Sequence, residues 1–277
     1  MQGFVRRFLR NRAAAAGGLW VLGLILIGLL APWLAVGDPL RVGGDAFAPP
    51  GRDYWFGTDN QGRDIWSGIL HGTRVSLTVG FLAAVTSSSI GITVGAAAGF
   101  YGGRADAFLM RMTELFQIMP RFFLALIIIS LFGAGLGKVI FVIGVLSWPP
   151  TARLIRAEFL SLKQREFIEA ARATGMGDLG LCFQQILPNA LAPAVVAGSL
   201  DVAQAILLEA SLSFFGLGDP NLISWGSMLY GAQGYLHQGW WLSVFPGTAI
   251  FLTVLAFNLM GDGINEALNP RLRERAG

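Results

Sequence analysis

Long apolar stretches separated by short polar segments run along most of the chain. A helix needs about 20 mostly apolar residues to cross the roughly 30 Å hydrocarbon core of a membrane. The pattern therefore predicts an all-α integral membrane protein with six transmembrane helices. Their expected ranges are 13–36, 75–100, 110–131, 139–155, 190–215 and 242–259. Prolines interrupt the third range at Pro120 and the fourth at Pro149 and Pro150, so these spans are expected to be irregular.

The distribution of basic residues predicts the orientation of these helices, because the cytoplasmic loops of membrane proteins are enriched in Lys and Arg. With six spans, three quarters of the 20 Lys and Arg residues fall on one side. The residues on the poorer, extracytoplasmic side are Arg41, Arg52, Arg63, Arg74 and Lys138. The richer side includes both chain ends and, in this count, Arg121, so both termini are predicted to be cytoplasmic.

The same pattern predicts how the chain is organised. The first apolar run follows four arginines and resembles a secretion signal, but it is too long for a cleaved one, so we expect a retained helix. The expected segments are a cytoplasmic N-terminal segment at 1–12, the first transmembrane helix at 13–36, an extracytoplasmic segment at 37–73, a five-helix core at 74–266 with a cytoplasmic loop at 158–188, and a cytoplasmic tail at 267–277.

The composition excludes the common soluble classes of protein. Hydrophobic residues make up 54% of the chain and charged residues 13%, with a mean hydropathy of +0.59. A soluble domain carries about a quarter charged residues. The chain is therefore not a typical soluble enzyme, a nucleic-acid-binding protein or a disordered polypeptide. One cysteine allows no internal disulfide, and two distant histidines give no metal site, so no cofactor is expected in this chain.

Three glycines recur at every fourth position of the second predicted span. Gly91, Gly95 and Gly99 share one face of that helix. Small residues at this spacing let two helix backbones approach closely. We expect helix packing there rather than the lining of a pore, and the spacing leaves open whether the partner helix belongs to this chain or to another subunit.

Polar residues inside the fifth predicted span are candidates for function. Asp201, Gln204 and Glu209 fall within about half of the helix circumference. A carboxylate at mid-membrane costs roughly 2.5–3.5 kcal/mol on insertion scales, so it seldom faces lipid. These three residues are predicted to line a translocation path or gate. The alternative is a structural hydrogen bond between helices.

The stretch 132–139 resembles a phosphate-binding loop only in part. Its glycines and Lys138 are spaced one residue too closely, and Val139 stands where Ser or Thr is required. The predicted topology also places it on the extracytoplasmic side. We expect an outer turn there, so any ATPase that drives this protein must be a separate polypeptide.

The cytoplasmic loop at 158–188 has a pattern of its own. Residues 166–173 are helix-forming, Gly175 is a typical helix stop, and Pro188 stands at the start of the next span. The pattern predicts a helix, a turn and a second short helix before that span. Such a rigid unit is suited to transmit a movement from a partner protein; the alternative is a surface loop without a special role.

This loop resembles the EAA loop of permease subunits of binding-protein-dependent ABC importers. The matching residues are Glu169-Ala170-Ala171, Gly175 and Ile186-Leu187-Pro188, while Gln185 departs from the general pattern. The form of the second part is similar to the peptide/nickel branch, and in particular to the C-type permease of dipeptide and oligopeptide importers. Further stretches that carry this resemblance are 56–59, 62–64, 74–77, 208–218, 224–226, 257–262 and 269–273.

The resemblance implies a type I ABC importer permease in the cytoplasmic membrane of a bacterium or archaeon. Its implied partners are a second, homologous permease subunit, two ATPase subunits or domains that bind ATP and Mg²⁺, and an extracytoplasmic solute-binding protein. This chain itself would be non-catalytic and would move di- or oligopeptides by alternating access. The residues implied to form a coupling helix that inserts into an ATPase cleft are Glu169, Ala170, Ala171, Arg172 and Gly175.

Other functions stay open from the sequence. The same machine could import nickel chelates, opines or small glycosides, and the loop at 217–225 lacks the proline-rich insert that many peptide permeases carry. A stand-alone channel or secondary carrier is a second alternative, although such carriers often contain internal repeats and none is evident here. A structural membrane scaffold is a third.

Overall fold

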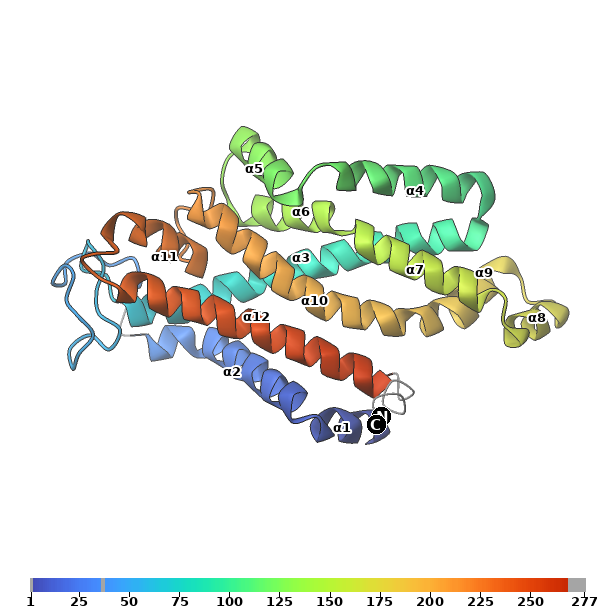
Figure 1. Cartoon of the computed structure of the whole chain (residues 1–277), viewed down its shortest axis with the longest axis horizontal. Helices are drawn as coiled ribbons and strands as arrows, with labels where there is room; N and C mark the ends of the chain where they lie inside the picture. Colours follow the sequence, from blue (N-terminus) through green and yellow to red (C-terminus); the bar gives the residue numbers. More distant parts are fainter. Residues whose placement is uncertain (1, 36–37, 269–277) are drawn as a thin grey trace.

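The computed structural model describes residues 2–35 and 38–268. Within this part, every element of regular secondary structure is a helix. Figure 1 shows an elongated bundle in which the long helices run roughly side by side. The all-α prediction is confirmed for the described residues. The resembling stretch at 269–273, most of the predicted tail and residue 36 of the first predicted span lie outside them.

The helices follow one another with short connections, apart from one long irregular segment between the second and third. Their bounds are α1 Gln2–Arg10, α2 Arg12–Leu34, α3 Ile65–Tyr101, α4 Gly103–Ile118, α5 Arg121–Phe132, α6 Leu136–Ser147, α7 Pro149–Leu162, α8 Glu166–Ala173, α9 Asp178–Gly180, the π-helical η1 Leu181–Ile186, α10 Leu187–Phe214, α11 Trp225–Ala232, the 3₁₀-helical η2 Gln233–Tyr235 and α12 Trp241–Leu268.

Four continuous helices of the described part are long and apolar enough to cross a membrane: α2, α3, α12 and the run Asp178–Phe214. Two bent pairs reach the required length together. The pair α4 and α5 bends by 80°, and the pair α6 and α7 bends by 41°. The breaks coincide with the prolines that interrupt the third and fourth predicted spans. Six spans are obtained if each bent pair counts as one, which agrees with the predicted number.

Helix α3 begins at Ile65, well before the apolar stretch that predicts its span. Asp64 caps it, because its carboxylate accepts a hydrogen bond from the backbone N–H of Ser67 at 2.8 Å. The preceding segment is irregular but ordered around Thr58, whose hydroxyl accepts a hydrogen bond from the backbone N–H of Ala48 at 2.8 Å. The helical part of α3 therefore extends into the segment 37–73 that was predicted to lie outside the membrane.

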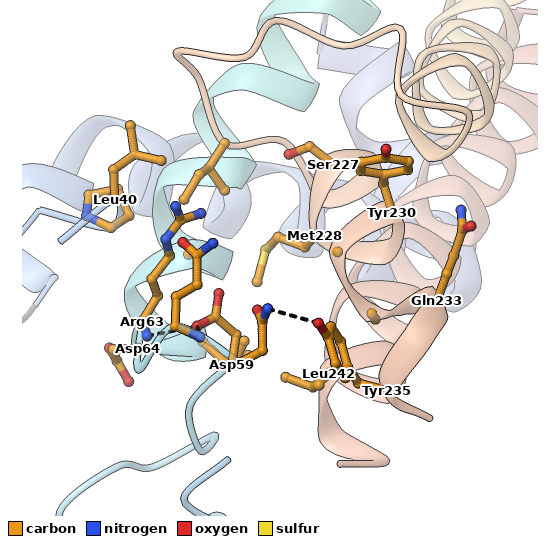
Figure 2. Close-up of a pocket in the computed structure, with 18 of the residues that line it drawn as sticks. Leu40, Asp59, Arg63, Asp64, Ser227, Met228, Tyr230, Gln233, Tyr235 and Leu242 are labelled. Atoms are coloured by element: carbon orange, nitrogen blue, oxygen red, sulfur yellow. Dashed lines mark hydrogen bonds between the residues drawn. The ribbon is translucent and has the colours of Figure 1, made fainter. Parts of the chain in front are cut away.

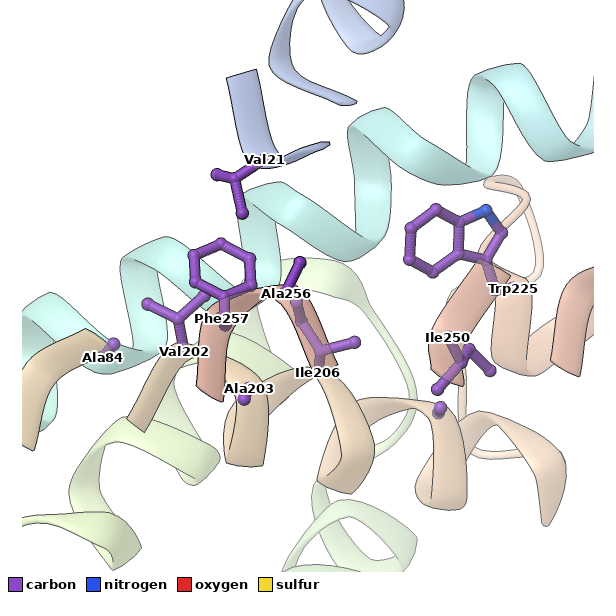
Figure 3. Close-up of a cluster of buried hydrophobic side chains, with 10 residues drawn as sticks. Val21, Ala84, Val202, Ala203, Ile206, Trp225, Ile250, Ala256 and Phe257 are labelled. Atoms are coloured by element: carbon purple, nitrogen blue, oxygen red, sulfur yellow. The ribbon is translucent and has the colours of Figure 1, made fainter. Parts of the chain in front are cut away.

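One large buried cluster joins α2, α3, α10, α11 and α12. Figure 3 shows Phe257 of α12 between Val21 of α2 and Val202 of α10, with Trp225 of α11 at another part of the same cluster. The indole N–H of Trp225 also donates a hydrogen bond to the backbone carbonyl of Ile69 in α3 at 3.2 Å. Lipid tails are as apolar as these side chains, so close van der Waals packing rather than exclusion of water holds such a cluster together within a membrane.

Helix α10 is continuous with the second short helix that was predicted to precede it in the loop at 158–188. The residues Asp178–Phe214 form one helix, with a π-helical turn at Leu181–Ile186 just before Pro188. Pro188 has no N–H to donate, and a local change of helical hydrogen bonding next to it lets the chain pass through without a break. Residues 178–188 of the predicted loop are therefore part of the same helix as the fifth predicted span.

The two ends of the bundle carry different structures (Figure 1). Helices α8 and α9 lie at one end, and the irregular segment before α3 lies with α11 at the other. The start of α2 and the end of α12 point towards the first of these ends. A ligand or partner at one end must therefore influence the other through the long helices.

Candidate functional site

The two breaks in the bent helices open onto one cavity of about 240 Å³. Gln117 and Pro120 line it at the α4–α5 break, and Leu146, Pro149 and Pro150 line it at the α6–α7 break. Prolines cannot donate the backbone hydrogen bond of a regular helix. Broken helices of this kind are tolerated within a membrane where they border protein or a water-filled cavity.

Arg121 is the charged residue of this cavity. Its Nη2 donates a hydrogen bond to Oε1 of Gln204 in α10 at 2.8 Å. The sequence count grouped Arg121 with the cytoplasmic residues, and the structure places it at the start of α5, directly after the break in the α4–α5 pair. Basic residues within membrane spans are rare and mark ion or substrate pathways more often than lipid-facing surface. The residue was missed as a site candidate because charge was counted by loop.

Asp201 and Gln204 lie near one another and face the bent helices. The Oδ2 of Asp201 accepts a long hydrogen bond from Oγ1 of Thr151 in α7 at 3.4 Å. Arg121 is close enough for its charge to act on Asp201 as well. Two of the three predicted path residues thus meet at the junction of α5, α7 and α10.

Glu209 lies apart from these two, in a buried position closer to the end that carries α11. Its side chain is 3% exposed, and its Oε1 accepts a hydrogen bond from Oγ of Ser213 at 2.7 Å. Its Oε2 has no hydrogen-bond partner among the described residues. It borders a void of about 10 Å³ that Ser224 also lines, close to the smallest space that holds one water molecule. The three predicted path residues therefore fall into two separate environments.

The three glycines of α3 lie against α7 of the same chain. A Cβ at Gly91 would stand 2.9 Å from the carbonyl oxygen of Trp148, and one at Gly99 would stand 2.5 Å from Cβ of Phe159. A Cβ at Gly95 would overlap the carbonyl oxygen of Ala152. The bare glycine faces let the backbones of the two helices approach, which places the partner helix within this chain.

The candidate coupling residues lie on and just after α8. Ile168 is buried and packs into the cluster that contains Phe159, which anchors α8 to the long helices. Glu169, Ala170 and Arg172 are exposed, and Ala171 is partly buried. Helix α8 thus presents three of these four residues away from the bundle.

Gly175 ends α8 in a conformation that favours glycine. Its φ is +86°, and its N–H donates to the carbonyl of Arg172 while that of Met176 donates to the carbonyl of Ala171. These two bonds form the Schellman arrangement that closes many helices. Nothing lies within 4 Å of a Cβ at Gly175, so its conformation rather than crowding requires glycine.

Large apolar side chains are exposed beside α8. Phe167 is 41% exposed, Leu179 70% and Phe183 61%. They belong to the loop at 158–188, which the predicted topology places outside the hydrocarbon region. Exposed apolar residues gathered next to charged ones are typical of a protein interaction surface. Periodicity did not single out these residues, because it does not distinguish lipid from a protein partner.

The opposite end contains a larger cavity of about 570 Å³, between the segment before α3 and α11 (Figure 2). Asp59 and Arg63 come from the first, and Tyr230 and Tyr235 from the region of α11 and η2. The Nδ2 of Asn60 donates a hydrogen bond to the hydroxyl of Tyr235 at 3.2 Å. This cavity joins two segments far apart in the sequence.

The loop after α10 is fastened to the start of α6 by Asp219. Its Oδ1 accepts from the backbone N–H of Asn221 at 2.9 Å, and its Oδ2 accepts from that of Leu136 at 3.0 Å. The hydrogen bond from Asn221, followed by that from Leu136, holds the pKa of Asp219 below its usual value. An ionised Asp219 therefore stabilises the contact between the loop after α10 and the start of α6.

Comparison with known proteins adds a family to this geometry. Residues 91–274 match the profile of the inner membrane component of binding-protein-dependent transport systems, and residues 1–50 match the N-terminal transmembrane domain of oligopeptide transport permease C. The chain is 40% identical over 279 residues to a glutathione transport system permease protein of Pectobacterium atrosepticum, covering 98% of this chain and 91% of the relative.

Two further relatives show similar agreement. A di/tripeptide transport system permease protein of Pseudomonas aeruginosa is 38% identical over 281 residues, covering 99% of this chain and 93% of the relative. A dipeptide transport system permease protein of Haemophilus influenzae is 36% identical over 282 residues, covering 99% and 96%. The resemblance that the sequence motifs carry is confirmed over nearly the whole chain.

Proposed function

The chain belongs to the family of inner membrane components of binding-protein-dependent transport systems, and from this premise we propose that it moves short peptides through the membrane as one permease subunit of an ATP-driven importer. It is a multi-pass protein of the bacterial inner membrane. The names of its relatives, which specify dipeptides, di/tripeptides and glutathione, support peptides as the cargo. The proposal rests most directly on the match of residues 91–274 to this family.

In this proposal, cargo crosses the membrane beside the bent helices. The cavity at the α4–α5 and α6–α7 breaks, with Asp201 and Gln204 close by, supports a path at this junction. A second, homologous permease subunit completes the path from the other side. Helix α4 buries only Thr113 among the described residues, which leaves a large surface for such a partner.

Movement of the cargo is coupled to ATP hydrolysis at the end of the bundle that carries α8. ATP and Mg²⁺ bind to two separate ATPase subunits or domains, and the exposed Glu169, Ala170 and Arg172 of α8 enter a cleft in them. The solute-binding protein docks at the end that carries α11. ATP drives this alternation only if it binds the two states of the importer with different affinity, and α8 is the proposed route by which that difference reaches the membrane helices.

The first test is gentle extraction of the complex and mass spectrometry of its proteins and small molecules. A second permease, an ATPase and a binding protein loaded with peptides would support the proposal. A nickel chelate, an opine or a glycoside in place of the peptide would replace the cargo and keep the mechanism. Conduction by the purified chain alone in vesicles without ATP would overturn the importer proposal.

The second test addresses coupling. Glu169→Lys reverses the charge of an exposed α8 residue and is expected to abolish ATP-driven uptake while the protein still reaches the membrane. The matched control is Glu166→Lys at the start of the same exposed helix, which is expected to transport. Equal uptake by the Glu169→Lys variant and the natural protein would contradict the proposed role of α8.

A further inference from the structure

Arg121 occupies an unusual position for a basic residue. It is the first residue of α5, directly after the 80° break between α4 and α5, and its side chain reaches Gln204 of α10. A guanidinium group has five N–H donors in a planar arrangement. One hydrogen bond of Arg121 to a protein side chain is observed, to Gln204. The group therefore retains donors for a ligand in the adjoining cavity.

The backbone around the break adds to this positive character. Helix α5 has no side-chain cap at its N-terminus, so its first N–H groups have no partner within the helix. The N-terminal end of a helix also carries a partial positive charge. Arg121 and this helix end together favour an anion, and the planar guanidinium fits the two oxygens of a carboxylate in particular.

The opposite wall of the cavity provides acceptors. In a regular helix, the carbonyls of Val145 and Leu146 would accept from the N–H groups of residues 149 and 150, but both are prolines. The carbonyls of Val145 and Leu146 thus lack these helical donors, and Leu146 lines the cavity. The Arg121 guanidinium group can bind a carboxylate, and a free carbonyl at the end of α6 can accept a hydrogen bond from an amide N–H next to that carboxylate.

The size of the cavity restricts what it can hold. Its volume is about 240 Å³. Complete sites for drug-sized ligands are usually about 300–1,000 Å³. The cavity therefore suits one end of a longer molecule rather than a whole oligopeptide.

From these observations we propose that Arg121 binds the C-terminal carboxylate of the cargo inside the membrane domain, with α6 accepting a hydrogen bond from the adjacent amide. The inference rests on the proposed peptide import and adds a cargo-contacting residue to it. Gln204 acts as a positioning residue, because its hydrogen bond orients the guanidinium group towards the break.

The test compares uptake of trialanine with uptake of trialanine amide by the complete importer in vesicles, with its binding protein and ATP. The measured quantity is the uptake rate of trialanine divided by the uptake rate of trialanine amide. Preferences of the binding protein affect every variant alike and cancel when ratios are compared. In Arg121→Gln, the ratio is expected to fall by about tenfold or more relative to the natural protein, since hydrogen bonds between charged groups are among the strongest.

Arg121→Lys keeps the charge but loses the planar pair of donors. Its ratio is therefore expected to lie between those of the natural protein and the Arg121→Gln variant. Arg111→Gln is the matched control, because Arg111 is an exposed arginine of α4 paired with Glu114 away from the cavity. Its ratio is expected to equal that of the natural protein. If Arg121→Gln fails to assemble with its partners, the Lys variant decides the question.

A different role for Arg121 is neutralisation of Asp201. If this were its role, adding Asp201→Asn to Arg121→Gln would restore the ratio, whereas binding of the carboxylate predicts that the ratio stays low. A restored ratio, or an unchanged ratio in whichever single variant assembles, would overturn the inference. Failure of the natural importer to take up either peptide would instead overturn the proposed function.

Discussion

Replacing Gly95 by alanine perturbs the contact between α3 and α7 at a single atom. A Cβ at this position would overlap the backbone carbonyl oxygen of Ala152 and stand 2.9 Å from Cβ of Ile155. Ordinary contacts of a Cβ atom lie at 3.4–4 Å. Backbone atoms of a helix cannot rotate out of the way as a flexible side chain can, so the two helices must move apart.

The size of the effect follows from two opposing contributions. Overfilling a well-packed contact costs typically about 1–3 kcal/mol. Alanine in place of glycine within a helix gains about 0.5–1 kcal/mol. We expect Gly95→Ala to lower the free energy of unfolding by about 1–2 kcal/mol. Gly247→Ala in α12 is the matched control, because nothing lies within 4 Å of its Cβ and only the gain applies.

The assay is unfolding in mixed micelles of increasing dodecyl sulfate content, followed by helical circular dichroism. The two alanine variants are expected to move in opposite directions from the natural protein and to differ by about 2 kcal/mol. A Gly95→Ala variant that is as stable as Gly247→Ala would refute the close approach of α3 and α7.

Three further outcomes are expected. Gly175→Val is expected to abolish ATP-driven vesicle uptake, because valine disfavours a φ of +86°. The control Gly177→Ala, at a φ of −69°, is expected to transport. Equal uptake by the two variants would exclude a conformational requirement at Gly175. The contact made by Asp219 is expected to be complete above the unfolded pKa of about 3.9 and to be lost as the pH falls through its lower folded pKa. Hydrogen exchange at the Leu136 amide should show this loss in the natural protein but not in Asp219→Asn. Glu209→Leu removes the buried acceptor of Ser213 and is expected to cost about 1–3 kcal/mol in the micelle assay, while Glu209→Gln keeps an acceptor and should cost less; the reverse order would contradict the observed hydrogen bond.

Apolar length predicted the number and approximate position of the spans, because a membrane imposes a minimum length on any helix that crosses it. The same signal could not locate the start of α3. Residues 65–74 include Trp66, Ser67, His71 and Arg74 and do not read as part of a span, yet Asp64 caps a helix directly before them. Hydropathy reports the solvent around a helix, whereas caps determine where it begins.

The candidate sites were predictable to different degrees. Spacing placed Gly91, Gly95 and Gly99 on one face, but a repeat within one helix contains no information on which helix it meets. Arg121 was assigned by counting charge within predicted loops, and such a count cannot show that its side chain meets Gln204 of α10. The partner of the glycine face and the contact of Arg121 both depend on how two segments distant in the sequence meet, which only the folded chain reveals.

The continuous helix Asp178–Phe214 has a mechanical consequence. Its 37 residues extend about 55 Å at 1.5 Å per residue, nearly twice the roughly 30 Å hydrocarbon thickness. When a helix of this length tilts as one unit by about 10° around its middle, each end is displaced by about 5 Å in opposite directions. A small push at the α8 end would thus reach the far end as a swing of comparable size, with no intervening loop to absorb it.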